Sequence, residues 1–261
     1  MLQRRMGHNG VVYYASPLLE RINVPHAFST RAGGVSPAPF DSLNLGNPNG
    51  CAIQDEYDRV WENYRLLQDA AGCRDGLLCH VHQVHGAGVV RAHKGAEFDT
   101  SAKADAIVTD DPRKVASVRV ADCVPILLAT TDGRTVAAVH AGWRGVISGV
   151  VTAALAEIGS RDVFAAIGPC IGIDSFEVGP EVLDAFRSKF GTSAPVAASA
   201  NGKGRVDLRQ AVSMQLTQAG VPAERIDSTD RCTHRDRGEF YSHRRDNGVT
   251  GRMAAVISPA R

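Results

Sequence analysis

The sequence lacks several features that mark particular classes of protein. No apolar run approaches the roughly 20 residues that a membrane-spanning helix needs, which argues against an embedded protein. Charge of one sign is not in excess: Lys and Arg number 29 against 28 Asp and Glu, so no broad basic face for nucleic acid is expected. The first ten residues, MLQRRMGHNG, lack the apolar stretch of a signal peptide, which predicts a cytoplasmic protein. No segment of the sequence indicates a protein partner.

The chain also lacks a linker rich in Ser, Pro or charge, so we expect one domain over residues 1–261, with 1–9 a candidate flexible segment. Its six cysteines are most simply free thiols in a cytoplasmic protein, although an even number permits bridges.

Short apolar strands alternate with helical patterns along the chain. The strand candidates are 106–109, 115–120, 126–129, 136–139, 163–167 and 253–257. The Asp132-Gly133 pair between two of them is typical of a hairpin turn, so part of the sheet should be antiparallel. Four helical patterns begin near 60, 145, 180 and 207, and they end at Gly72, Gly159, Gly191 and Gly220. This mixture predicts a layered α/β or α+β domain.

Three residues that can bind a metal, His85, Cys123 and His140, lie where short apolar patterns give way to Gly- or Pro-marked turns. One thiolate and two imidazoles are good zinc ligands, and three protein ligands leave a fourth position for water or substrate, as in catalytic sites. Their separations of 38 and 17 residues match no compact zinc motif, and each residue could instead be packed in a core.

A rival pair, His80 and His82, lies just before His85. Side chains alternate along a strand, so in an extended segment His80 and His82 share one face while His85 is on the other. Either His85 belongs with the distant Cys and His, or His80 and His82 form a separate pair of ligands. We favour the simpler interpretation that His80 and His82 are two partly exposed sheet residues.

Several motifs in the same order resemble the YfiH-type laccase-domain family: FSTRAGGVS, FDSLNLG, QVHG, ADCVPIL, VHAGWRG, IGPCIG, CT, FYSHRRD and TGRM. The first two occupy a long loop, 28–50, rich in Gly, Pro, Ser and Asn. The resemblance implies a single layered α/β/β/α domain with mixed sheets, and zinc held by His85, Cys123 and His140.

The same resemblance implies phosphorolysis of adenosine, inosine and methylthioadenosine-like nucleosides to the base and ribose 1-phosphate, together with adenosine deamination. Purine nucleosides and phosphate would then be the partners. An older family label is a copper-dependent polyphenol oxidoreductase. That label fits poorly, because a multicopper oxidase needs a three-copper cluster held by several His-X-His pairs and this chain has one such pair. Copper could still occupy the Cys-His-His site, since it generally binds such ligands more tightly than zinc.

Phosphorolysis requires cationic groups for phosphate and polar groups for a purine. Arg144, beside a predicted helix start at Gly145, and Arg31 in the long loop are candidates, and Arg245 of FYSHRRD is a further one. Asn44 and Gln83 could read a purine edge or orient ligands.

Two other functions use the same residues. In a metal-free cysteine hydrolase or amidase, an activity that would suit the peptidoglycan editing associated with bacterial members, Cys123 is the nucleophile and His140 or His85 the base. In a binding module the pocket persists without turnover. Asp122, next to Cys123, could carry protons, but neighbours on a strand point to opposite faces.

Overall fold

Two six-stranded sheets and one three-stranded sheet make up the computed structural model, which describes residues 1–47, 50–198 and 202–261. The first sheet has the order β1 (Gln3–Met6), β2 (Val12–Ala15), β3 (His26–Ser29), β15 (Met253–Ile257), β7 (Lys114–Val120) and β4 (Leu77–Cys79). The second has the order β14 (Ile226–Asp227), β10 (Val163–Ile167), β8 (Val124–Thr130), β9 (Val136–Ala141), β6 (Ala106–Thr109) and β5 (Val89–Ala92). The small sheet has the order β11 (Glu177–Val178), β13 (Gly204–Val206) and β12 (Val196–Ala198).

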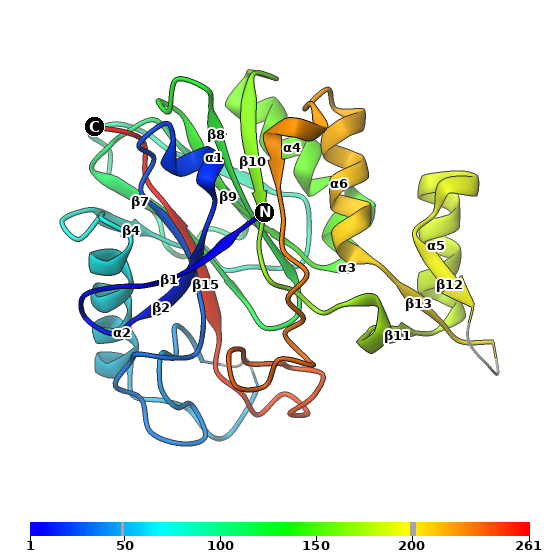
Figure 1. Ribbon diagram of the computed structural model, residues 1–261, viewed down its shortest axis with the longest axis horizontal. Helices are drawn as coiled ribbons and strands as arrows, with labels where there is room; N and C mark the ends of the chain where they lie inside the picture. The colour runs from blue at the N-terminus through cyan, green and yellow to red at the C-terminus, as the bar shows by residue number, and fades with distance from the viewer. Residues whose placement is uncertain (48–49, 199–201) are drawn as a thin grey trace.

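The structure has six α-helices within the described residues, and four of them, α2, α3, α4 and α6, cover the outer faces of the two large sheets. The six helices are α1 (Pro17–Glu20), α2 (Tyr57–Ala70), α3 (Trp143–Ser148), α4 (Val150–Ile158), α5 (Pro180–Phe190) and α6 (Leu208–Gln218), with single 3₁₀ turns at Ile173–Ser175, Gly191–Ser193 and Ala223–Arg225. Figure 1 shows α2 on one side of the paired sheets and α3, α4 and α6 on the other, while α5 and the small sheet project from the body. No helix in the described ranges is long and apolar enough to cross a membrane.

Alternation of side chains along β8 builds two separate cores. Ile126 and Leu128 face α4 and α6, whereas Leu127 packs between the two sheets against residues such as Phe28 and Val118. A third core lies between the first sheet and α2, where Leu67 is buried. A strand that is apolar on both faces belongs in the middle of such a stack. The layered α/β/β/α arrangement predicted above is therefore confirmed.

Strand pairing within the large sheets is mixed. β8 and β9 pair antiparallel across the turn at Asp132-Gly133, as predicted, whereas β4 pairs parallel with β7 and β5 pairs parallel with β6. All six predicted strands are present, three of them with the predicted bounds (β6, β10 and β15).

The single helix predicted from about Gly145 to Ile158 is wrong, because the segment forms two helices, α3 and α4. Gly149 between them has φ +83°, a left-handed conformation that glycine adopts at little cost, and its N–H closes α3 before α4 starts in a new direction. Periodicity alone does not reveal the break, since apolar residues continue on both sides of it.

Two predicted loop segments have partly regular structure. Gln3–Met6 pairs antiparallel with β2, so flexibility of 1–9 stays a prediction that this pairing does not favour. The long loop begins within β3, and its residues 48–49 lie outside the described part of the chain.

Candidate active site

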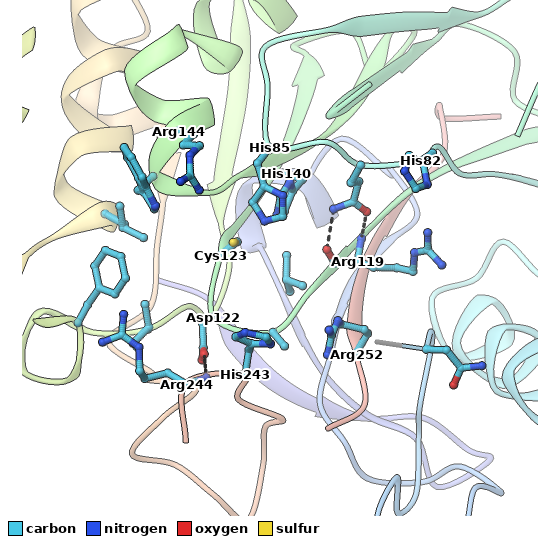
Figure 2. Close-up of a pocket in the computed structure, with 18 residues that line it drawn as sticks. His82, His85, Arg119, Asp122, Cys123, His140, Arg144, His243, Arg244 and Arg252 are labelled. Carbon is cyan, nitrogen blue, oxygen red and sulfur yellow. Dashed lines mark hydrogen bonds between the residues drawn. The ribbon is translucent and has the colours of Figure 1, made fainter. Parts of the chain in front are cut away.

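His85, Cys123 and His140 meet at one end of the second sheet. His140 lies near the end of β9, Cys123 lies on the turn between β7 and β8, and His85 lies on the turn between β4 and β5. Val124 is opposite Ala141 in the β8–β9 register, which brings the Cys123 turn beside the end of β9. One ligand atom from each residue lies within 4.8 Å of the other two (Figure 2). Two imidazoles and a thiol that converge in this way fit the donor set of zinc.

This geometry decides between the two histidine arrangements left open by the sequence. His85 groups with Cys123 and His140, and the described residues contain no second cluster of three or more potential metal ligands. His82 lines the same cavity as these three residues, and the ring centre of His80 lies 6.0 Å from that of Trp61.

Asp105 holds two of the three residues in place. Its Oδ1 accepts hydrogen bonds from His140 Nδ1 at 2.8 Å and from the His85 N–H at 2.9 Å, while Oδ2 accepts from the Gly86 N–H at 2.6 Å and the Val84 N–H at 3.3 Å. Because His140 Nδ1 is engaged in this way, its Nε2 is the nitrogen left for a metal. The carboxylate also supports the His85 backbone, whose φ of +59° is unfavourable for a residue with a side chain.

Cys123 and His140 change each other's proton affinity. Burial on its own raises the pKa of the Cys123 thiol, but the charge and hydrogen bonds of His140 and His85 more than reverse this and lower the pKa to about 6. Burial on its own lowers the pKa of His140, whereas the Cys123 thiolate and Asp105 raise it to about 9. At neutral pH Cys123 is therefore a thiolate beside a protonated imidazole, and the thiolate is the form that binds metals or attacks as a nucleophile.

Gly142 leaves room for the triad formed by His85, Cys123 and His140. A Cβ at this position would lie 2.8 Å from His85 Cδ2 and 3.1 Å from Cys123 Sγ, closer than a carbon atom is normally found. Gly142 is also the N-cap of α3, so the glycine that starts the helix is the one that permits the three side chains to converge.

The triad lies in the wall of a cavity of about 390 Å³. Part of this wall is apolar and is formed by Trp143, Ile171, Phe176 and Leu208. Two arginines stack on its aromatic rings: the Arg144 guanidinium lies 4.3 Å from the centre of the Trp143 ring, and that of Arg244 lies 5.2 Å from the Phe176 ring. Planar apolar surfaces of this kind suit a flat heterocycle.

The cavity is strongly cationic. Four arginines line it, whereas Asp122 is the single carboxylate among the described lining residues. Both oxygens of Asp122 are already engaged, by the Thr233 hydroxyl at 2.6 Å and by the Arg244 N–H at 2.7 Å. Asp122 therefore ties the C-terminal loop to the turn that carries Cys123, and its φ of +92° shows that this turn is tightly bent.

Of the predicted substrate-binding residues, Gln83 and Arg144 line the cavity. The other three, Arg31, Asn44 and Arg245, are not part of the described lining, and their side chains have structural partners. Arg31 donates to the Asp41 carbonyl and stacks on Tyr241, and the buried Asn44 donates to Asp55.

Arg245 is the most enclosed of these three residues. Its guanidinium donates to the carbonyls of Thr233, His234 and Phe240 and pairs with Asp246 at 2.8 Å. Its side chain is only 8% exposed, so it organises the C-terminal loop from inside rather than presenting charge to a ligand.

The sequence reasoning did not identify Asp105, Gly142, Arg119, Arg252 or His243, all of which contact the triad or line the cavity. A partial signal was present for three of them, because Gly142 is in VHAGWRG, His243 in FYSHRRD and Arg252 in TGRM. Asp105 immediately precedes a fully buried strand, and an acidic residue at such a position is a reason to look for a buried partner.

Comparison with known proteins gives consistent matches over nearly the whole chain. A family model described as "Multi-copper polyphenol oxidoreductase laccase" matches residues 25–260. The chain is 39% identical over 231 residues to the protein named purine nucleoside phosphorylase YfiH of Escherichia coli (strain K12), a match that covers 88% of this chain and 91% of that protein.

Solved structures agree with these matches. The crystal structure of YlmD from Geobacillus stearothermophilus superposes with a TM-score of 0.86 at 30% identity, covering 99% of both chains. That of the Bacillus licheniformis hypothetical protein YfiH gives a TM-score of 0.85 at 28% identity, covering 98% of both chains.

Proposed function

Because the chain belongs to the multi-copper polyphenol oxidoreductase laccase family, whose matched relatives include proteins named purine nucleoside phosphorylase, we propose that it is a zinc-dependent purine nucleoside phosphorylase. The observation that carries the proposal is the convergence of His85, Cys123 and His140 in the wall of a cavity that is both aromatic and cationic. The substrates are adenosine, inosine or related purine nucleosides together with orthophosphate.

The three ligands fit zinc on chemical grounds. Cys123 is a thiolate at neutral pH, and Asp105 accepts a hydrogen bond from His140 Nδ1, so zinc would bind through Cys123 Sγ and, once it displaces the imidazole proton, through His140 Nε2. When bound, zinc supplies Lewis-acid stabilisation of negative charge on an oxygen or nitrogen atom. Copper can occupy the same donors, so copper binding in solution is compatible with the proposal.

The cavity wall performs the other tasks of phosphorolysis. Trp143 and Phe176 hold a purine base by stacking, Leu208 helps to exclude water from it, and Arg144 beside the Trp143 ring adds donors at the edge of the base. The remaining arginines offset the charge of phosphate. In the reaction an oxygen of hydrogen phosphate bonds to ribose C1′ as the C1′–N9 bond breaks. The electron pair goes to N9, and the proton of hydrogen phosphate ends on the base.

We extend the proposal to adenosine deamination at the same triad, which would give inosine. A laccase-type oxidation is less well supported, because it needs a separate three-copper cluster, and the described residues hold one potential metal-binding group.

The second candidate is a metal-free cysteine hydrolase. It is favoured by one observation: Cys123, His140 and Asp105 form a continuous chain of contacts, in the order nucleophile, base and orienting carboxylate. Stoichiometric zinc in protein purified without added metal would count against it. Rapid inactivation of metal-free protein by iodoacetamide, with loss of hydrolysis, would count for it.

The test of the main proposal is product analysis of adenosine by chromatography, with and without orthophosphate. Adenine and ribose 1-phosphate that form only with phosphate support phosphorolysis, and inosine supports deamination. Cys123→Ala should lose both activities and its zinc. The Cys123→Ala preparation also controls for contaminating enzymes, whereas Cys73→Ala, which removes a core thiol outside the cavity lining, should retain both activities and controls for the loss of a cysteine as such. Equal turnover by the wild type and Cys123→Ala would refute the proposal.

A further inference from the structure

Arg119 and Arg252 are two half-buried cavity arginines that form no ion pair with a carboxylate among the described residues. Arg119 comes from β7 and Arg252 directly precedes β15, its antiparallel neighbour in the first sheet. Neither forms an ion pair within the described ranges 1–47, 50–198 and 202–261, although most arginines that face a protein's interior do. Two desolvated cations side by side are unfavourable unless an anion joins them.

The electrostatics of Arg252 reflect this arrangement. Burial lowers the pKa of its guanidinium, the thiolate of Cys123 raises it, the charge of Arg119 lowers it, and the carboxylate of Asp122 raises it. Arg252 is thus close enough to interact electrostatically with both Arg119 and Cys123 of the triad. An anion placed between the two guanidinium groups would relieve their repulsion.

Both arginines are held in place through their backbones by side-chain amides. Gln83 forms two hydrogen bonds with Arg119, donating Nε2 to its carbonyl and accepting from its N–H, each at 2.8 Å. Asn44 Oδ1 accepts from the Arg252 N–H at 2.9 Å. The sequence suggested that these two residues either read a purine edge or orient ligands, and in the structure their amides hold the backbones of the two cations.

Gly46 makes space for the Arg119 side chain. A Cβ at residue 46 would lie 2.8 Å from Arg119 Cδ and 3.3 Å from Nη1. The side chain therefore lies against the backbone of the loop that follows Asn44, and a side chain at residue 46 would displace it.

Most guanidinium donors of the pair have no protein partner among the described residues. Arg252 uses Nη1 for the carbonyls of Thr250 and Gly251, which leaves Nε and Nη2. Arg119 makes a single long contact, from Nη2 to the Val81 carbonyl at 3.4 Å. The fork of donors that matches phosphate oxygens is thus available on both side chains.

The arginine pair and Arg144 lie on opposite sides of the triad. In Figure 2, Arg144 lies on one side of His85, Cys123 and His140, and Arg119 and Arg252 lie on the other. Arg144 is stacked on Trp143 within the apolar part of the wall. In phosphorolysis the nucleophile and the leaving base are on opposite faces of ribose C1′, so the two ends of the cavity should take different parts of the substrates.

We propose that Arg119 and Arg252 form the orthophosphate subsite, with the triad between the phosphate and a base held at the Trp143 end. The choice of orthophosphate as the anion rests on the proposed function, but the anion subsite itself does not. Arg144, the arginine favoured by sequence reasoning for phosphate, then serves the nucleoside.

The test uses zinc-loaded protein and reads phosphate and nucleoside separately. Arg119→Gln and Arg252→Gln should each raise the KM for orthophosphate by about 10-fold to 100-fold, the size expected for a charged hydrogen-bonding group, while the nucleoside KM changes by less than about threefold. Arg144→Gln should show the reverse pattern. Arg134→Gln, which removes the same charge from a side chain that is 86% exposed, should change neither constant and serves as the control.

Isothermal titration calorimetry measures the affinity for orthophosphate without nucleoside, and it therefore separates this inference from the proposed function. Phosphate binding that is lost in Arg119→Gln and Arg252→Gln supports the subsite even if no nucleoside is turned over. Phosphorolysis with an unchanged phosphate KM in both variants overturns the subsite and leaves the function intact.

Structural damage is controlled by two further variants. Arg252→Lys keeps the charge but loses the guanidinium fork, so it should bind phosphate more weakly than the wild type and better than Arg252→Gln. Gly46→Ala keeps both arginines but displaces Arg119, so it should also raise the phosphate KM. If neither variant alters phosphate binding while both remain folded, the inference is wrong.

Discussion

Replacing Asp105 with Asn should weaken zinc binding more than its position outside the ligand set would suggest. The carboxylate accepts four hydrogen bonds, one from His140 and three from the turn that carries His85. Asn can keep the oxygen that serves His140 and His85, but its amide NH₂ would then face the N–H groups of Gly86 and Val84. Two donors would meet where a donor and a charged acceptor now lie 2.6 Å apart.

The magnitude follows from these contacts. Loss of a hydrogen bond to a charged group costs about 1.5–3 kcal/mol of stability. Partners that orient a metal-binding histidine typically contribute 10-fold to 100-fold in affinity, equivalent to roughly 1.4–2.8 kcal/mol. We therefore expect a zinc affinity about 10-fold to 100-fold lower in Asp105→Asn, with the zinc-free protein destabilised by about 1.5–3 kcal/mol.

Zinc affinity is measured by competition with a chromophoric chelator, and stability by urea unfolding of the zinc-free protein. Asp110→Asn removes an exposed carboxylate five residues along the chain and should change neither quantity. A folded Asp105→Asn protein with wild-type zinc affinity would show that Asp105 does not orient the ligands.

Three further predictions concern other parts of the chain. Gly142→Ala should lower zinc content at unchanged expression, because its Cβ would displace His85 or Cys123, and full zinc occupancy would contradict this. Arg245→Gln should lower the free energy of unfolding by about 2–4 kcal/mol, because buried hydrogen bonds to a charged group are lost, while the phosphate KM of the folded enzyme changes little. A raised phosphate KM at normal stability would instead place Arg245 in the binding site. Burial lowers the pKa of His26, whose Nε2 accepts a hydrogen bond from the Ser16 N–H, so below about pH 6.5 the unfolded chain binds more protons than the folded protein. The free energy of unfolding should therefore fall as the pH drops from 6.5, by at most about 1.4 kcal/mol per pH unit. This part of the pH dependence should disappear in His26→Gln.

Much of the fold could be read from local pattern. The strands 106–109, 163–167 and 253–257 are short apolar segments bounded by turn residues, and they appear with the predicted bounds because a buried strand needs such a composition wherever it pairs. The break at Gly149 was not readable in the same way. A glycine within an apolar helical pattern is compatible both with a continuous helix and with a left-handed stop, and packing decides between them.

The candidate metal-binding group was also accessible from the sequence. Cys123 and His140 each lie close to the end of a strand pattern, and their residue types restrict the chemistry to metal binding or nucleophilic attack. Spacing alone did not provide the grouping itself, which the sequence supplied only through its resemblance to a family. His85 joins them because its turn is held by Asp105, and this contact spans 20 residues that carry no periodic signal.

The sequence by itself therefore determined the composition of the layers and the residue types available at the site, since burial and side-chain chemistry are properties of each residue and its near neighbours. Only the tertiary structure decided which polar side chains face the cavity. Arg245 and Arg252 are seven positions apart in the same cationic segment, yet one donates to three carbonyls inside a loop and the other lines the cavity. The difference arises from the register of β15 against β7 and from the hydrogen bond between Asn44 and the Arg252 backbone, and both join segments far apart in the chain.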